Sequence, residues 1–136
     1  MDGSRNCGSF SVSFTQALHS SSTIVNGQSI YLGNPNGVVI KPKDGPGIYH
    51  MGDTDLFSDM ALIAEIYAPK IGLVPVGDRF TMSPREAAYA CNLLKPKSVI
   101  PMHFGTFPLL TGTPGQLQKL APDVDVVELK PGVTVS

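Results

Sequence analysis

Residues 47–60 read GIYHMGDTDLFSDM, and an apolar run ends there at Gly52 and Asp53 before a second apolar pattern begins. Residues 48–51 have the short apolar pattern of a strand. From residue 55 onward the spacing of the apolar side chains becomes helical, at Leu56, Met60, Ile63, Ile66 and Tyr67. The stretch therefore predicts a strand, a turn that contains an aspartate, and a helix.

The order of strand and helix recurs toward the C-terminus. Residues 71–76 (IGLVPV) and 98–101 (SVIP) are nearly continuous apolar runs, which are typical of strands covered on both faces. Pro75 indicates that the first run ends there or is irregular. Residues 83–86 (SPRE) have the serine, proline and glutamate spacing of a capping box, so they predict a helix that extends to about residue 94. Residues 113–116 (TPGQ) predict another helix start in the same way.

Strand patterns dominate the N-terminal third of the chain. They cover residues 11–18, 30–32 and 38–41. Residues 19–22 read as a polar loop, and residues 33–37 (GNPNG) read as a turn between two strands. At the C-terminal end, residues 124–129 and 133–135 have β propensity. The succession of strands and helices predicts an α/β fold.

Composition limits the class of protein. The chain has 136 residues, of which 42% are hydrophobic and 15% charged, so one globular domain over residues 1–136 is expected. The formal net charge is -1 and the charges are scattered, which argues against a nucleic-acid partner. Cys7 and Cys91 lie far apart in a chain without an apolar signal region or a membrane-length run. This pattern favours a cytoplasmic protein with no disulfide framework and no membrane partner.

Three side chains of metal-binding types directly follow three predicted strands. His19 follows residues 11–18, Asp53 follows residues 48–51 apart from one glycine, and His103 follows the run VIPM. Ligands gather at the carboxyl ends of strands in open α/β sheets, so the three side chains are predicted to lie at one sheet edge. Simpler interpretations stay open, since Asp53 could cap the following helix and either histidine could be a hydrogen-bonded loop residue.

Other polar residues have structural interpretations. His50 lies inside its predicted strand and is interpreted as a packing or surface residue. Arg79 could attract an anionic substrate group, but a solvated arginine or a structural pair with Asp78 is the simpler interpretation. Serines 20–22 read as a turn, with anion binding as the alternative. A Ser-His-Asp triad is not favoured, because the chain has no G-x-S-x-G elbow.

Several segments together resemble a known family. They are HSSS (19–22), GNPNGVVI (33–40), IYHMGDTDLFSDM (48–60), VPVGDRFTMSP (74–84) and IPMHFGTFP (100–108). In this order they resemble the C-terminal half of the metal-dependent hydrolases of metallo-β-lactamase fold, in particular a group near the ascorbate-phosphate lactonases. The resemblance covers about residues 8–120. It implies an αββα sandwich of two similar halves, of which this chain would supply one mixed sheet with helices on one face.

The resemblance also implies a role for each candidate residue. His19 corresponds to a histidine that ligates one metal, Asp53 to a carboxylate that bridges two metals, and His103 to a histidine on the second metal. Zinc is the expected metal, and manganese or iron would also suit these ligands. Such a site lowers the pKa of a bound water from about 15.7 towards roughly 7, which would give a hydroxide for attack on an ester, lactone, amide or phosphoester. Asp53 is accordingly the expected catalytic residue.

The chain departs from the family pattern in one respect. The family's principal signature, His-x-His-x-Asp-His, should precede all of the segments above, and it is absent; the only histidines are His19, His50 and His103. Two metals need about six ligand positions, with a bridging group counted twice. The candidate residues supply fewer, so weak or partial metal occupancy is expected in this chain alone.

Half of a sandwich leaves one face of its sheet uncovered. Such a chain is expected to form a homo-oligomer or to bind a chain that carries the missing N-terminal half. Two interpretations of its function stay open. In one, the chain is part of a metal-dependent hydrolase that acts on a small molecule; in the other, it is a non-catalytic remnant that serves as a protein-interaction module. A neighbouring gene that encodes His-x-His-x-Asp-His would favour the first.

Overall fold

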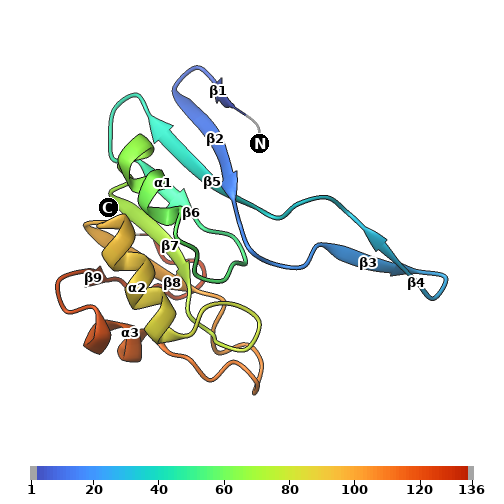
Figure 1. The fold of residues 1–136 in the computed structure, drawn as a ribbon. Coiled ribbons are helices and arrows are strands. Elements are labelled where there is room, and N and C mark those ends of the chain that lie inside the picture. The colour runs from blue at the N-terminus through green and yellow to red at the C-terminus, as the bar shows by residue number, and fades with distance from the viewer. Residues whose placement is uncertain (1–2, 135–136) are drawn as a thin grey trace.

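The computed structural model describes residues 3–134, and it has a mixed sheet with three helices, shown in Figure 1. The strands at Ser4–Asn6 and Ser22–Val25 were not predicted from the sequence. The last strand, Asp125–Val126, is short. The elements in chain order are β1 (Ser4–Asn6), β2 (Phe10–Gln16), β3 (Ser22–Val25), β4 (Gln28–Tyr31), β5 (Asn36–Pro42), β6 (Ile48–His50), α1 (Met60–Tyr67), β7 (Ile71–Pro75), α2 (Pro84–Leu94), β8 (Ser98–Met102), α3 (Pro114–Leu120) and β9 (Asp125–Val126). The predicted α/β class is confirmed.

The main sheet has seven strands in the order β1-β2-β5-β6-β7-β8-β9. Strands β1, β2, β5 and β6 pair antiparallel with their neighbours, whereas β6, β7, β8 and β9 pair in parallel. It follows from these directions that β2, β6, β7 and β8 all end at the same edge of the sheet. The segments that follow these four strands therefore meet at that edge.

The helices pack on one face of the sheet, where the core lies. The strand residues Val39, Tyr49, Val74 and Val99 are buried on this face together with Met60, Ile63, Ala87 and Leu117 of the three helices. Tyr49 is fully buried, and its hydroxyl accepts a hydrogen bond from Thr15. The expected arrangement of helices on one face of a mixed sheet is confirmed.

The opposite face of the sheet is apolar but only half-buried. By register it carries Val12, Phe14, Val38, Ile40, Ile48, Ile71, Leu73 and Ile100. Phe14 is 46% exposed, and the other side chains of this set are of intermediate exposure. No described helix packs on this face, which contrasts with the buried residues of the helical face.

The two strands predicted on either side of residues 33–37 are present as β4 and β5, but they do not pair with each other. Strand β4 pairs with β3 across a turn at Asn26 and Gly27, and β5 pairs with β2. Residues 32–35 connect the β3–β4 hairpin to β5 of the main sheet. The sequence pattern missed β3 because its polar first residues resemble the loop that precedes them, although Asn26 and Gly27 are a local signal for a hairpin turn.

The helix boundaries are explained by their capping residues. Both predicted capping boxes are present: Ser83 with Glu86 begins α2, and Thr113 with Gln116 begins α3. Helix α1 begins later than its pattern suggested, because residues 58–59 form a turn, and the side chain of its N-cap Asp59 makes no capping hydrogen bond. At the C-terminal end only residues 125–126 form a strand, residues 133–134 do not, and residue 135 lies outside the described residues. None of the helices within residues 3–134 is long and apolar enough to cross a membrane.

Candidate functional site

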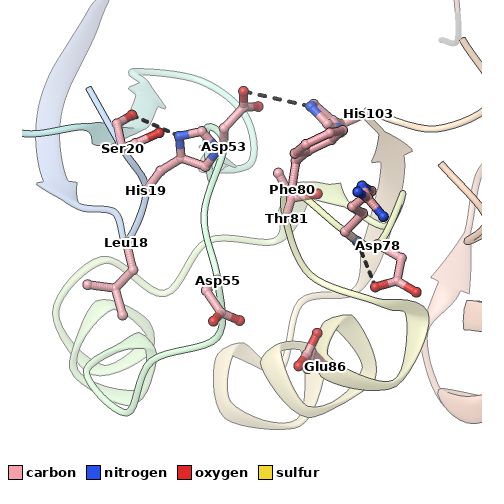
Figure 2. Close-up of a pocket in the computed structure, with 11 residues that line it drawn as sticks. Leu18, His19, Ser20, Asp53, Asp55, Asp78, Phe80, Thr81, Glu86 and His103 are labelled. Atoms are coloured by element: carbon pink, nitrogen blue, oxygen red, sulfur yellow. Dashed lines mark hydrogen bonds and ion pairs between the residues drawn. The ribbon is translucent and has the colours of Figure 1, made fainter. Parts of the chain in front are cut away.

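The three predicted metal-binding residues line one pocket at the shared edge of the sheet. His19 lies beyond the end of β2, Asp53 beyond β6 and His103 directly after β8. Figure 2 shows the pocket, with Asp53 between the two histidines in this view. The prediction that these residues share one edge of the sheet is therefore confirmed, while their roles as metal ligands stay predictions.

Asp53 and His103 approach each other most closely. The Oδ2 atom of Asp53 lies 3.8 Å from Nε2 of His103, and the two side chains are 52% and 26% exposed. The other ring nitrogen of His103, Nδ1, is buried and has no hydrogen-bond partner among the described residues. The nitrogen that faces Asp53 in the pocket is therefore Nε2.

The backbone of His103 is held in an unusual conformation. Its φ is 55°, in the left-handed region that side chains other than glycine rarely adopt. The carbonyl oxygen of His103 lies against Gly77, where an added Cβ atom would be only 1.9 Å away. Such constrained conformations concentrate at functional sites, where the surrounding structure has to impose them. A glycine at position 77 is thus required for the position of His103.

The turn at Gly52 and Asp53 explains why an aspartate follows a buried strand. Gly52 has a φ of +70°, and a Cβ atom on it would lie 2.7 Å from the carbonyl oxygen of Asn36. Only glycine fits this turn without strain. The turn directs Asp53 into the pocket, where its side chain makes no capping hydrogen bond; α1 begins several residues later. The capping interpretation of Asp53 is therefore wrong.

Thr54 connects the segment of Asp53 to the segment of His19. Its buried hydroxyl accepts a hydrogen bond from the amide of Leu18 at 2.9 Å and donates one to the carbonyl of Asp55 at 2.8 Å. The amide of Asp55 donates to the carbonyl of Leu18, and the amide of Met82 donates to the carbonyl of Thr54. Sequence reasoning considered Thr54 only as a possible helix cap and did not predict these contacts, although its place beside Asp53 was a signal. Thr54 thereby joins three of the segments that form the pocket.

His19 is exposed, and its Nδ1 atom lies 2.8 Å from the carbonyl oxygen of Ser20. A carbonyl accepts, so this contact requires the proton on Nδ1 and leaves Nε2 with its lone pair available. That tautomer is the one in which a histidine binds a metal through Nε2 while a backbone oxygen orients the ring. The hydrogen-bonded interpretation and the ligand interpretation of His19 are thus compatible.

His50 and Arg79 differ in detail from their predictions. His50 is the last residue of β6, not an interior one; it is exposed, and its Nδ1 accepts a hydrogen bond from the amide of Gly52. The Asp78 carboxylate accepts hydrogen bonds from the backbone amide of Arg79 and from the hydroxyl of Thr111, so its contacts are not with the guanidinium. The guanidinium of Arg79 lies over the ring of Phe80, 5.7 Å from the ring centroid.

The donor atoms at the pocket fit a divalent transition metal in kind. Two imidazoles and one carboxylate are suitable for zinc, manganese or iron. Among residues 3–134, however, no three His, Cys, Asp or Glu side chains are gathered closely enough to hold an ion. The close pair of Asp53 and His103, with a separate His19, is part of a ligand set and not a whole one.

Comparison with known proteins is consistent with this geometry. Residues 1–104 match the family model of the beta-lactamase superfamily domain. A UPF0173 metal-dependent hydrolase of Methylocella silvestris is 66% identical over 113 residues, which are 82% of this chain and 49% of that protein. One from Koribacter versatilis is 47% identical over 134 residues, which are 98% of this chain and 58% of that protein. The chain thus spans about half the length of these relatives.

Solved structures show the same fold. The metallo hydrolase Igni18 of Ignicoccus hospitalis superposes with a TM-score of 0.84 at 34% identity, covering 99% of this chain and 57% of that one. An isothiocyanate hydrolase from Delia radicum gut bacteria superposes with a TM-score of 0.77 at 16% identity, covering all of this chain and 57% of that one, and shows the fold alone. The sheet, its helices and the match over residues 1–104 place this chain in the beta-lactamase superfamily, with a metallo-β-lactamase-like fold.

Proposed function

We propose that this chain is the C-terminal part of a metal-dependent hydrolase and that it acts together with a segment that supplies the remaining metal ligands. The observation that carries the proposal is the convergence of His19, Asp53 and His103 on one pocket, with Asp53 and His103 only 3.8 Å apart. The relatives from Methylocella silvestris and Koribacter versatilis, which bear the name metal-dependent hydrolase, support the same reaction class.

Each residue has a distinct role in this proposal. The Nε2 atoms of His19 and His103 would each hold one metal, and the Asp53 carboxylate would contact both. An anion between two cations offsets their mutual repulsion, which explains why a carboxylate occupies the middle position. When bound, the metals would lower the pKa of water and polarise the substrate's carbonyl or phosphoryl oxygen. Esters, lactones, amides and phosphoesters are the substrate classes that suit this chemistry, and zinc is the metal of first choice.

The half-buried face of the main sheet is where the missing segment would pack. Ile40, Ile48, Ile71 and Leu73 lie on this face in adjacent strands, with no charged side chain among them. Burying such a surface is favourable by roughly 25 cal/mol per Å² of apolar area. A second sheet on this face would bring further ligands to the same edge without disturbing the helices on the other face.

A protein-interaction module without catalysis is the second candidate function. It is favoured by one observation: residues 3–134 do not gather three metal-binding side chains. In that case the half-buried sheet face would bind a partner protein, and the pocket would catalyse no reaction. The two candidates differ in whether the Asp53 carboxylate is needed for anything besides folding.

Fragment complementation tests the proposed function. The partner fragment is the part of the Methylocella silvestris relative that this chain does not match, which in this proposal is N-terminal and carries the His-x-His-x-Asp-His segment. Mixing both fragments with zinc or manganese should produce hydrolysis of 4-nitrophenyl esters or bis(4-nitrophenyl) phosphate. Asp53→Ala and His103→Ala should each reduce the rate by at least about 100-fold, the scale of losses that follow removal of groups essential to catalysis.

Two matched variants serve as controls in this assay. Asp123→Ala removes an exposed carboxylate far from the pocket residues in the chain, and His50→Asn keeps an acceptor for the Gly52 amide. Both should leave the rate within about twofold. Hydrolysis that survives Asp53→Ala would contradict the proposed role of Asp53. A folded complex with no hydrolysis under either metal would favour the interaction module.

A further inference from the structure

The β3–β4 hairpin, residues 22–31, extends away from the main sheet as an arm, as Figure 1 shows. Every residue of this arm is exposed. Its strands pair with each other, and the backbone hydrogen bond from Leu32 to Ser21 closes its base. The arm therefore receives little stabilisation from the body of the chain.

The arm carries apolar side chains on both of its faces. Ile24 and Tyr31, on one face by register, are 75% and 67% exposed. Val25 and Ile30, on the other face, are 50% and 42% exposed. A hairpin that only displayed a loop to water would have a polar face, so apolar side chains on both faces are unusual for an isolated hairpin and indicate that the arm makes a contact.

The geometry of the arm is specified by its own sequence. Asn26 and Gly27 have φ values of 49° and 77°, which match the two-residue turn that the dipeptide Asn-Gly favours in hairpins. An isolated two-stranded hairpin is at best marginally stable in water, whereas three or more strands with an apolar face are stable. Added strands would therefore stabilise this hairpin, which has no neighbouring strand among the described residues.

We propose that the arm pairs with the arm of a second copy of this chain, edge to edge, to form a four-stranded sheet. Both outer edges of the arm present unpaired backbone groups, and identical strands related by a twofold axis pair antiparallel. Such pairing joins two marginal hairpins into one sheet of four strands and brings side chains of neighbouring strands into lateral contact. It requires no other protein and is independent of the proposed hydrolase reaction.

The charge distribution favours a second copy over an unrelated partner. From Asn6 to Ile40 the chain has no Asp, Glu, Lys or Arg. Near a twofold axis each residue lies close to its own copy, so any charge there would face a like charge. A neutral stretch avoids this repulsion, whereas recognition of a different protein usually uses complementary charges. The neutral, apolar arm is thus suited to bind itself.

A shortened arm tests the proposal. Because Ser21 and Leu32 are hydrogen-bonded at the base, residues 22–31 can be replaced by Asn-Gly without stretching the chain. In analytical ultracentrifugation at micromolar concentration, the native chain should form a dimer, and the shortened variant should dimerise at least tenfold more weakly. The control is Leu62→Gln combined with Ile66→Gln, which removes equally exposed apolar side chains from α1 and should leave the dimer unchanged.

Disulfide trapping shows which surfaces meet. In a Cys7→Ser background, which removes the exposed thiol, Thr23→Cys should form a covalent dimer under mild oxidation and Ser58→Cys should not. A monomeric native chain, undiminished association of the shortened variant, or equal trapping at both positions would each overturn the proposal. An arm that is needed to bind the N-terminal fragment of a relative, but not for self-association, would also overturn it.

Discussion

The amide of Leu18 donates a hydrogen bond to the hydroxyl oxygen of Thr54 at 2.9 Å, across 36 positions of sequence. Leu18 immediately precedes His19, and Thr54 immediately follows Asp53. The bond therefore fixes the separation of two proposed metal ligands through their backbones. Because Thr54 is completely buried, water cannot replace its hydroxyl if that group is lost.

Thr54→Val should destabilise the fold and Thr54→Ser should do so much less. Valine has nearly the same shape as threonine, but it leaves the Leu18 amide without an acceptor, which costs about 1–3 kcal/mol. Serine keeps the hydroxyl and loses one methyl group. Urea unfolding followed by circular dichroism measures both changes. Equal stability of the valine variant and the native chain would show that the hydrogen bond contributes nothing, and Thr111→Val provides an exposed control.

Gly77→Ala should lower stability because the new Cβ atom would lie 1.9 Å from the carbonyl oxygen of His103. Overpacking of this kind costs about 1–3 kcal/mol, and here it would also displace a proposed ligand. Gly115→Ala is the matched control, since a Cβ there meets no atom within 4 Å and alanine favours the helix. Thermal unfolding should show a lower midpoint for the first variant and an equal or higher midpoint for the second.

The two thiols should differ in reactivity. Cys7 is exposed, whereas burial raises the pKa of the Cys91 thiol to about 11, so that Cys91 stays protonated at pH 8. Because the thiolate is the reactive form, Ellman's reagent should modify one thiol per native chain quickly and the second only after denaturation. Rapid modification of both thiols in the folded chain would contradict the burial of Cys91 in the core.

Burial of Cys91 should also make the fold less stable at high pH. In the unfolded chain this thiol ionises near its ordinary pKa of 9.0, whereas in the folded chain it ionises at about 11. Between these values the unfolded chain has released the proton and the folded chain has not, so the free energy of unfolding falls as pH rises from about 9 to 11. The contribution is about 1–3 kcal/mol.

A Cys91→Ala variant isolates this effect. Its free energy of unfolding should fall less steeply over the same pH range than that of the native chain. Burial likewise raises the pKa of Tyr49, against a smaller opposing effect of its hydrogen bond with Thr15. That contribution is the same in both proteins and cancels in the comparison. The free energy of unfolding of both proteins can be measured by guanidinium unfolding at pH 8, 9 and 10. The same change with pH in both proteins would refute the assignment to Cys91.

Metal binding by the chain alone should be weak. Isothermal titration with zinc should give less than one tightly held ion per chain, since the pocket supplies only part of a ligand set. Asp53→Asn should weaken this binding further by removing the charge between the histidines, and Asp123→Asn should not. A stoichiometric centre with two tightly bound ions in the purified chain would contradict the incomplete ligand set.

Local features of the sequence determined the helices and the central strands. The capping boxes at Ser83 and Thr113 involve residues only three positions apart, so they could be recognised without any tertiary information. The apolar runs of β7 and β8 likewise predicted two strands, although the face toward the helices is buried and the other face is mostly half-buried. Because the segments after parallel strands meet at one sheet edge, strand order along the chain was also sufficient to place His19, Asp53 and His103 together.

Only the tertiary structure decided which segments contact each other. The pairing of β5 with β2, the hydrogen bond between Leu18 and Thr54, and the close approach of Gly77 to His103 all depend on chain directions that no local pattern encodes. Strand pairing and loop contacts are set by the packing of the whole sheet, because a shift of one residue would turn every side chain of a strand to the other face. The sequence therefore specified the helices, the central strands and the candidate ligands, while the folded chain specified how those ligands are positioned.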